Sequence, residues 1–215
     1  MKIEAVLFDM DGTLIDSEPY WLSSEIELMA EFGYIWRTSD QAACLGGPLE
    51  RVGQYMSDLA RGQRDGDYFH HSLVERVSEK FHSGIAIVPG GLEILRDVKA
   101  ANIPMALVSA SPRVLVQAAI DSFPEPFFAT SVSSSDVLQT KPHPESYLKA
   151  AEALNVNIEN CLVIEDSLTG VHSGMASGAW VIAIPHIVPI EAAARVRLVT
   201  SLTGQNLESL ISLFD

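Results

Sequence analysis

Two aspartates lie where the first apolar run of the sequence ends, and they are its first candidates for chemistry. Asp9 and Asp11 flank Met10 directly after the run Ile3–Phe8, and Gly12 follows them. Because alternate side chains of a strand point to the same side, both carboxylates can face one small volume. Two negative charges so close are costly unless a cation or a shared proton lies between them. The pair therefore indicates metal binding or acid–base catalysis.

Further polar residues follow two later apolar runs, and a lysine lies between these runs. In chain order these polar residues are Ser109, Ser111, Lys141, Glu165 and Asp166, with Ala110 between the two serines. The runs themselves, Pro104–Val108 and Cys161–Ile164, have the length and composition of buried strands. The carboxyl ends of parallel strands share one edge of a sheet. We therefore expect four carboxylates, a serine hydroxyl and a lysine around one crevice.

This combination of groups suits phosphoryl transfer. Mg²⁺ prefers one or two carboxylates together with water and a substrate phosphate. A lysine can hold a phosphate oxygen, and a serine hydroxyl and backbone N–H groups can donate to the remaining oxygens. One carboxylate can attack phosphorus and form an aspartyl phosphate. A second can protonate the leaving oxygen and then deprotonate a water molecule.

The order of the apolar runs predicts the elements that position these groups. Buried strands are expected at Ile3–Phe8, Pro104–Val108, Cys161–Ile164 and Trp180–Ile184, with a shorter one at Phe127–Val132. Helical patterns between the later strands are expected at Leu92–Ala100, Pro112–Phe123, Pro144–Leu154 and Ser167–Ser177. Strands that alternate with helices predict an α/β fold with a doubly wound, Rossmann-like parallel sheet, whose site lies at the carboxyl ends of the strands.

The segment 17–82 has a different pattern. Its apolar residues recur at helical spacing, and it contains no clear strand-like run. Gly46-Gly47-Pro48 interrupts it. The sequence therefore predicts an α/β core domain of residues 1–16 and 83–215, with a helical cap domain of residues 17–82 inserted after the first strand.

The composition indicates the cellular compartment of the protein and excludes some classes of binding partner. Apolar residues make up 47% of the 215 residues, enough for a large core, and the formal net charge is −14. Such an acidic chain is a poor partner for nucleic acid or anionic lipid, so a phosphate site must be locally positive. Cys44 and Cys161 lie far apart, which suits a reducing compartment, and no apolar stretch approaches the roughly 20 residues that cross a bilayer. We expect a cytoplasmic protein without nucleic-acid or membrane partners.

The motifs and their order closely resemble the haloacid dehalogenase superfamily of aspartate-nucleophile phosphotransferases, over almost the whole chain. The string Asp9-Met10-Asp11-Gly12-Thr13 is similar to its first motif, Ser109 to the second, Lys141 to the third and Glu165-Asp166 to the fourth. The resemblance implies that Asp9 is the nucleophile and Asp11 the general acid and base. Asp11 also argues against dehalogenation, because a halide leaving group needs no proton.

The same resemblance implies which groups bind a metal ion and the transferring phosphoryl group. It implies Mg²⁺ held by Asp9, by the backbone carbonyl of Asp11 and by Asp166. Glu165 is either a further ligand or a neighbour of one. The resemblance also implies that the transferring phosphoryl group is bound by the Ser109 hydroxyl, the Ala110 N–H and the Lys141 ammonium group.

The inserted segment resembles the small cap of the β-phosphoglucomutase-like branch, for which a monomer is the default. Trp21 stands where the mutases carry a histidine, and Glu50 or Arg51 falls near their cap arginine. The string Asp16-Ser17-Glu18-Pro19-Tyr20-Trp21 and two later strings are similar to hexitol and 2-deoxyglucose 6-phosphate phosphatases. The resemblance therefore implies a Mg²⁺-dependent phosphatase for a small phosphorylated metabolite, a sugar or polyol phosphate. A sugar phosphomutase and a phosphate sensor without turnover are the alternatives.

Overall fold

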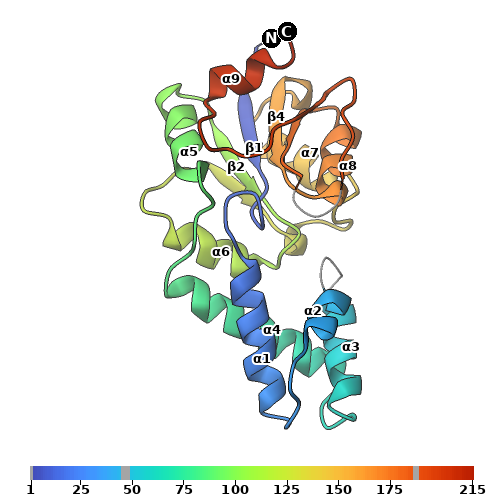
Figure 1. Ribbon diagram of the computed structural model, residues 1–215. Helices are drawn as coiled ribbons and strands as arrows, with labels where there is room; N and C mark the ends of the chain where they lie inside the picture. The colour runs from blue at the N-terminus through green and yellow to red at the C-terminus, as the bar shows by residue number, and fades with distance from the viewer. Residues whose placement is uncertain (1, 45–48, 186–188) are drawn as a thin grey trace. The chain divides into compact units, whose positions relative to one another are not determined.

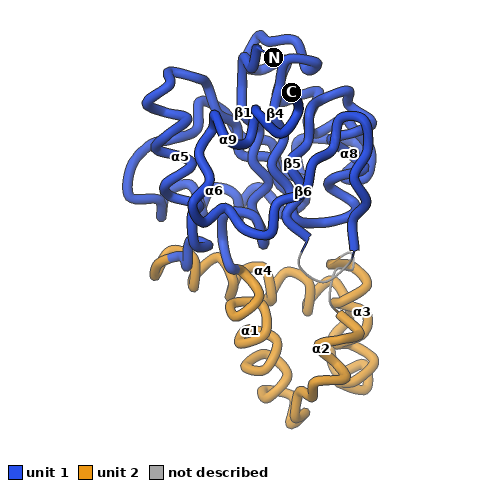
Figure 2. Tube along the Cα trace, turned by 45° about the horizontal axis from the view of Figure 1, so that its top comes forward, with its two compact units in different colours: residues 1–16, 85–215 blue, residues 17–84 orange. Residues whose placement is uncertain are grey.

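The computed structural model describes residues 2–44, 49–185 and 189–215, so the interruption expected at Gly46-Gly47-Pro48 lies outside the described residues. The chain forms two compact units, which Figure 2 distinguishes by colour. Unit 1 comprises Met1–Asp16 and Ile85–Asp215, and unit 2 comprises Ser17–Gly84. Unit 2 extends two residues beyond the predicted segment 17–82. The N–H groups of Ser83 and Gly84 still bond to carbonyls of the preceding helix, which explains the extension.

Unit 1 contains a sheet whose strands, within the described residues, follow the order β3-β2-β1-β4-β5-β6, and every neighbouring pair is parallel. The strands are β1 Ala5–Phe8, β2 Met105–Val108, β3 Thr130–Val132, β4 Cys161–Glu165, β5 Trp180–Ala183 and β6 Val196–Leu198. The predicted α/β fold with a parallel sheet is confirmed. β3 is shorter than the expected run. The sequence does not predict β6, because Arg197 interrupts a segment too short to stand out as a buried strand.

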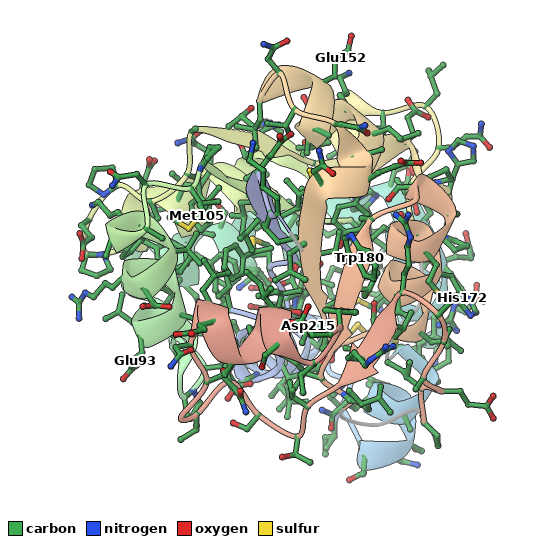
Figure 3. All side chains as sticks on the ribbon, turned by 90° about the horizontal axis from the view of Figure 1, so that it is seen from above. Glu93, Met105, Glu152, His172, Trp180 and Asp215 are labelled. Carbon is green, nitrogen blue, oxygen red and sulfur yellow. The ribbon has the colours of Figure 1, made fainter. Side chains whose placement is uncertain are left out.

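Helices cover both faces of this sheet (Figures 1 and 3). They are α5 Gly91–Ala100, α6 Arg113–Ser122, α7 Glu145–Ala153, α8 Leu168–Ser177 and α9 Leu207–Ser212, with short 3₁₀ helices at Ser134–Asp136 and Ile158–Asn160. Figure 3 shows Glu93 of α5 and Glu152 of α7 on opposite sides of the sheet. The four helices α5 to α8 begin and end within one residue of the predicted bounds, whereas α9 is not predicted.

One face of the sheet, together with α7 and α8, encloses a core of buried apolar residues. This core includes Leu7 of β1, Val163 of β4 and Tyr147 of α7. Asp9 lies two positions after Leu7, and Glu165 lies two positions after Val163. Because side chains alternate along a strand, both carboxylates point to the same face of the sheet as Leu7 and Val163. The two central strands thus direct two carboxylates toward α7.

Within its described residues, unit 2 consists of helices, in agreement with the prediction for this segment. They are α1 Glu18–Ala30, α2 Thr38–Cys44, α3 Leu49–Leu59 and α4 Gly66–His82. Their shared core includes Leu28, Met29, Met56 and Phe69. In the described parts of both units, no helix combines the length and the apolar character that crossing a bilayer requires.

A buried carboxyl group makes the stability of unit 2 depend on pH. Glu25 of α1 is 6% exposed. Burial and the nearby Glu18 raise the pKa of Glu25 from 4.5 to about 7, and the Trp36 side chain partly offsets this rise. In the unfolded chain the same carboxyl group ionises near pH 4.5. Between the two values the folded state binds more protons than the unfolded state, so stability falls as the pH rises.

Glu25→Gln removes this ionisation and should stabilise the protein more at pH 8 than at pH 5. The full effect is at most roughly 3 kcal/mol, the free energy that corresponds to the pKa shift. Thermal melting of wild type and variant, followed by circular dichroism at both pH values, measures it. Glu75→Gln is the control, because Glu75 is exposed on α4. The prediction would be contradicted if the stability difference between the Glu25→Gln variant and the wild type were the same at pH 5 and at pH 8.

Candidate active site

The side chain of Lys141 joins the carboxyl ends of three strands of unit 1. Its ammonium group donates to Asp9 Oδ1 at 2.6 Å, to Glu165 Oε1 at 2.7 Å and to the carbonyl oxygen of Val108 at 2.9 Å. The side chain is only 3% exposed. Burial alone lowers the pKa of Lys141, but the carboxylates of Asp9 and Glu165 raise this pKa well above its usual value. The lysine is therefore a fixed positive charge between two buried carboxylates.

Both carboxylate oxygens of Glu165 are engaged by protein donors. Oε1 accepts from Lys141 and, at 3.0 Å, from the hydroxyl of the fully buried Tyr147. Oε2 accepts from the N–H groups of Asp166 and Ser167 at 3.0 and 3.1 Å, and from the Ser167 hydroxyl at 3.0 Å. A carboxylate surrounded in this way has little capacity left for a metal ion. The geometry favours a supporting role for Glu165, which orients Lys141 on one side and the following loop on the other.

Asp9 and Asp166 lie close to Glu165, so three carboxylates share a small region. One oxygen from each lies within 4.8 Å of the other two. Burial raises the pKa of Asp9, and Glu165 and Asp166 raise it further against the opposing effect of Lys141. Burial and Glu165 likewise raise the pKa of Asp166 to about 7, although the Thr13 hydroxyl donates to this carboxylate at 3.2 Å. An excess of buried negative charge made of carboxylate oxygens fits a divalent cation such as Mg²⁺.

Asp11 lies beside two serine hydroxyls that follow β2. Its Oδ2 atom accepts from Ser109 Oγ at 3.1 Å and from Ser111 Oγ at 2.8 Å. The Ser109 oxygen in turn accepts from the Ser111 N–H at 2.9 Å. Among the described residues, none bonds to the buried Oδ1 atom of Asp11. Two hydroxyl groups thus hold one oxygen of this carboxyl group, and the other oxygen has no hydrogen-bond partner among the described residues.

The fold brings the sequence-derived candidates to one edge of the sheet in unit 1. Hydrogen bonds join Asp9, Lys141 and Glu165 into one group and join Ser109 to Asp11. Ala110 lies between the two serines, and its side chain is exposed. The sequence assigns no role to four residues that contact these candidates, namely Thr13, Ser111, Tyr147 and Ser167. Thr13 and Ser111 lie in strings that the sequence already singles out, whereas only placement in space distinguishes Tyr147 and Ser167.

Gly12 makes room for the carboxylate of Asp166, which predicts a strong effect of one added methyl group. The φ angle of Gly12 is +81°, and a Cβ atom there would lie 2.2 Å from Asp166 Oδ2. Gly12→Ala therefore adds a steric clash to the roughly 1–2 kcal/mol that a left-handed conformation costs alanine. Gly204→Ala is a matched control in the same unit, because its φ angle is +77° and nothing lies within 4 Å of the added atom.

Urea unfolding of the two alanine variants measures this difference. Gly12→Ala should lose about 1 kcal/mol or more of unfolding free energy beyond the loss in Gly204→Ala, since Asp166 must shift. Equal losses would show that the space beside Gly12 is not limiting.

Comparison with known proteins relates this geometry to a family. Residues 6–184 match the family described as haloacid dehalogenase-like hydrolases. The chain is 32% identical over 192 residues to hexitol phosphatase B of Escherichia coli, with 86% of this chain and 84% of that protein covered. It is 30% identical over 202 residues to 6-phosphogluconate phosphatase of Escherichia coli, with 88% and 87% covered. A crystal structure of CbbY from Rhodobacter sphaeroides in complex with phosphate aligns with a TM-score of 0.81 and 26% identity, over 97% of this chain and 99% of that one. The resemblance carried by the motifs is thus confirmed, and the chain belongs to the haloacid dehalogenase-like hydrolases.

Proposed function

We propose that this protein is a Mg²⁺-dependent phosphatase that hydrolyses a small sugar or polyol phosphate through an aspartyl-phosphate intermediate. The observation that carries the proposal is the buried Asp9 carboxylate, bonded at 2.6 Å to Lys141 and close to Asp166. A fixed positive charge beside a buried aspartate can neutralise a phosphoryl group as the carboxylate attacks it. Relatives named hexitol phosphatase B and 6-phosphogluconate phosphatase support the substrate class.

In the first step a carboxylate oxygen of Asp9 attacks phosphorus, and the bond between phosphorus and the substrate's alcohol oxygen breaks. The electron pair of that bond stays with the alcohol oxygen, which takes a proton from Asp11. Donors hold the phosphoryl oxygens during the transfer, so that the attacking and leaving oxygens stay in line. These donors are the groups of Ser109, Ala110 and Lys141.

In the second step the ionised Asp11 removes a proton from a water molecule, and the water oxygen attacks the phosphorus of the aspartyl phosphate. The bond between phosphorus and the Asp9 oxygen breaks, and inorganic phosphate leaves. Asp9 is again a carboxylate and Asp11 again carries a proton, so both are ready for the next substrate.

The metal ligands in this proposal are the carboxylates of Asp9 and Asp166 and the backbone carbonyl of Asp11. When bound, Mg²⁺ supplies positive charge to the phosphate oxygens. The raised pKa values of Asp9 and Asp166 support this assignment, because a cation relieves the repulsion that contributes to them. For Glu165 we favour the neighbouring role over direct ligation, since Lys141 and other protein donors occupy its oxygens.

A phosphate-release screen tests the proposed activity. The purified protein is incubated with a panel of sugar, polyol and nucleotide monophosphates and Mg²⁺, with and without EDTA. We expect release of inorganic phosphate from sugar or polyol phosphates, and we expect EDTA to stop it and excess Mg²⁺ to restore it. Formation of an isomeric sugar phosphate without phosphate release would show a phosphomutase instead.

A further inference from the structure

The two oxygens of the Asp11 carboxyl group have different surroundings. Oδ2 accepts from the hydroxyls of Ser111 and Ser109, at 2.8 and 3.1 Å. Oδ1 is buried, and no partner for it exists within the described residues. Two donors already face Oδ2, so Oδ1 is the oxygen of this carboxyl group that no donor of the described residues engages. The surroundings thus select the atom that can protonate a leaving group.

Ser109 cannot be the permanent partner of Asp11 in the reaction proposed above. Its Oγ atom accepts from the Ser111 N–H at 2.9 Å, and its hydroxyl has a single proton to donate. When that proton goes to a phosphoryl oxygen, Ser111 is the remaining donor to Oδ2. The Ser111 backbone is itself anchored, because its carbonyl oxygen accepts from the Ser134 N–H at 3.0 Å.

We propose that Ser111 is a positioning residue for proton transfer by Asp11, an inference that rests on the proposed phosphatase activity. The Ser111 hydroxyl holds Oδ2, so that Oδ1 keeps its proton toward the leaving oxygen. As the bond from phosphorus to that oxygen breaks, its electron pair moves onto the oxygen. The proton then passes from Asp11 Oδ1 to this leaving oxygen. Ser111 itself gains and loses no atom.

Two substrates separate this role from packing or phosphate binding. The alkoxide of a sugar or polyol phosphate is strongly basic and needs a proton to leave, whereas the 4-nitrophenolate of p-nitrophenyl phosphate leaves without one. Both substrates form the same phosphoenzyme, so kcat/KM compares their first steps. The alkyl substrate is the sugar or polyol phosphate that the wild type hydrolyses best in the screen.

For Ser111→Ala we expect kcat/KM to fall by about tenfold or more with the alkyl phosphate, and by less than about threefold with p-nitrophenyl phosphate. Ser111→Thr keeps a hydroxyl and should recover most of the alkyl activity. Ser111→Cys is a second variant without a hydroxyl, for use if the alanine variant does not fold. Ser122→Ala is the control and should affect neither substrate, because the Ser122 hydroxyl donates within α6 to the carbonyl oxygen of Ala118.

A double-variant cycle with Asp11→Ala completes the test. If Ser111 acts through Asp11, the double variant Ser111→Ala/Asp11→Ala should show the same ratio of kcat/KM between the two substrates as the single variant Asp11→Ala. An equal loss on both substrates in the single Ser111→Ala variant, or no loss on either, would overturn the positioning role. Failure of the proposed phosphatase activity is a distinct result, because the wild type itself would then release no phosphate.

Discussion

Asp9→Asn is expected to lower phosphate release by about 10⁴-fold or more, because an amide cannot form the aspartyl phosphate. The replacement keeps the shape of the side chain, and the amide oxygen can still accept the Lys141 hydrogen bond that Asp9 Oδ1 accepts at 2.6 Å. The loss should therefore appear in kcat of a folded protein. Phosphate-release kinetics, together with circular dichroism of the same sample, measure it. Mass spectrometry of the variant shows whether deamidation has restored the aspartate.

Asp16→Asn is the matched control for this experiment. Asp16 follows the same motif, but it is exposed, so its amide variant should retain wild-type turnover. Wild-type protein quenched in acid during turnover should carry one added phosphoryl group, located at Asp9 by peptide mass spectrometry. The assignment of the nucleophile fails if Asp9→Asn keeps most of its activity with deamidation excluded.

Lys141→Met is expected to lower both turnover and stability. The variant keeps an apolar stem of similar length but removes the charge that lies 2.6 Å from Asp9 and 2.7 Å from Glu165. Removing one partner of a buried ion pair costs about 3–5 kcal/mol, part of which protonation of the carboxylates recovers. Turnover should fall by about 100-fold or more, because the charge that neutralises the phosphoryl group is lost. Urea unfolding and phosphate release at pH 7 measure the two effects.

Lys99→Met tests whether burial is the reason for these effects. The Lys99 ammonium also donates to a carboxylate and to a backbone carbonyl, those of Glu125 at 2.7 Å and Pro126 at 3.1 Å. Its side chain is 44% exposed, so the ion pair should contribute less than about 1 kcal/mol. We expect wild-type turnover for this variant. Equal destabilisation by the two substitutions would argue against a special role for the buried lysine.

The strands and helices around the site could be read from local patterns. Continuous apolar runs of four or five residues are typical of parallel strands that are covered on both faces, and they end at Asp9 and Glu165. The prolines before α6 and α7 indicate where those helices begin. The C-terminal elements β6 and α9 are only three and six residues long, so a local pattern does not reveal them, although Leu207, Leu210 and Ile211 of α9 recur at helical spacing.

The partners of the site residues could not be read in the same way. Lys141 and Asp9 are separated by 132 positions, and Ser111 and Asp11 by 100. Whether such residues meet depends on strand order, on register and on the face to which each side chain points. Tyr147 illustrates the point, because in the sequence it is one more apolar position of a helix. In the fold its hydroxyl reaches Glu165 Oε1 at 3.0 Å.

The sequence alone therefore determined which chemical groups end the strands and which family they resemble, because residue type and spacing are local properties. The tertiary structure alone decided how those groups are paired. It engages both oxygens of Glu165 with protein donors and leaves one oxygen of Asp11 without a partner among the described residues. The physical reason is that hydrogen bonding and burial depend on distances between side chains, and only the packing of α7 and the loops against the parallel sheet sets those distances.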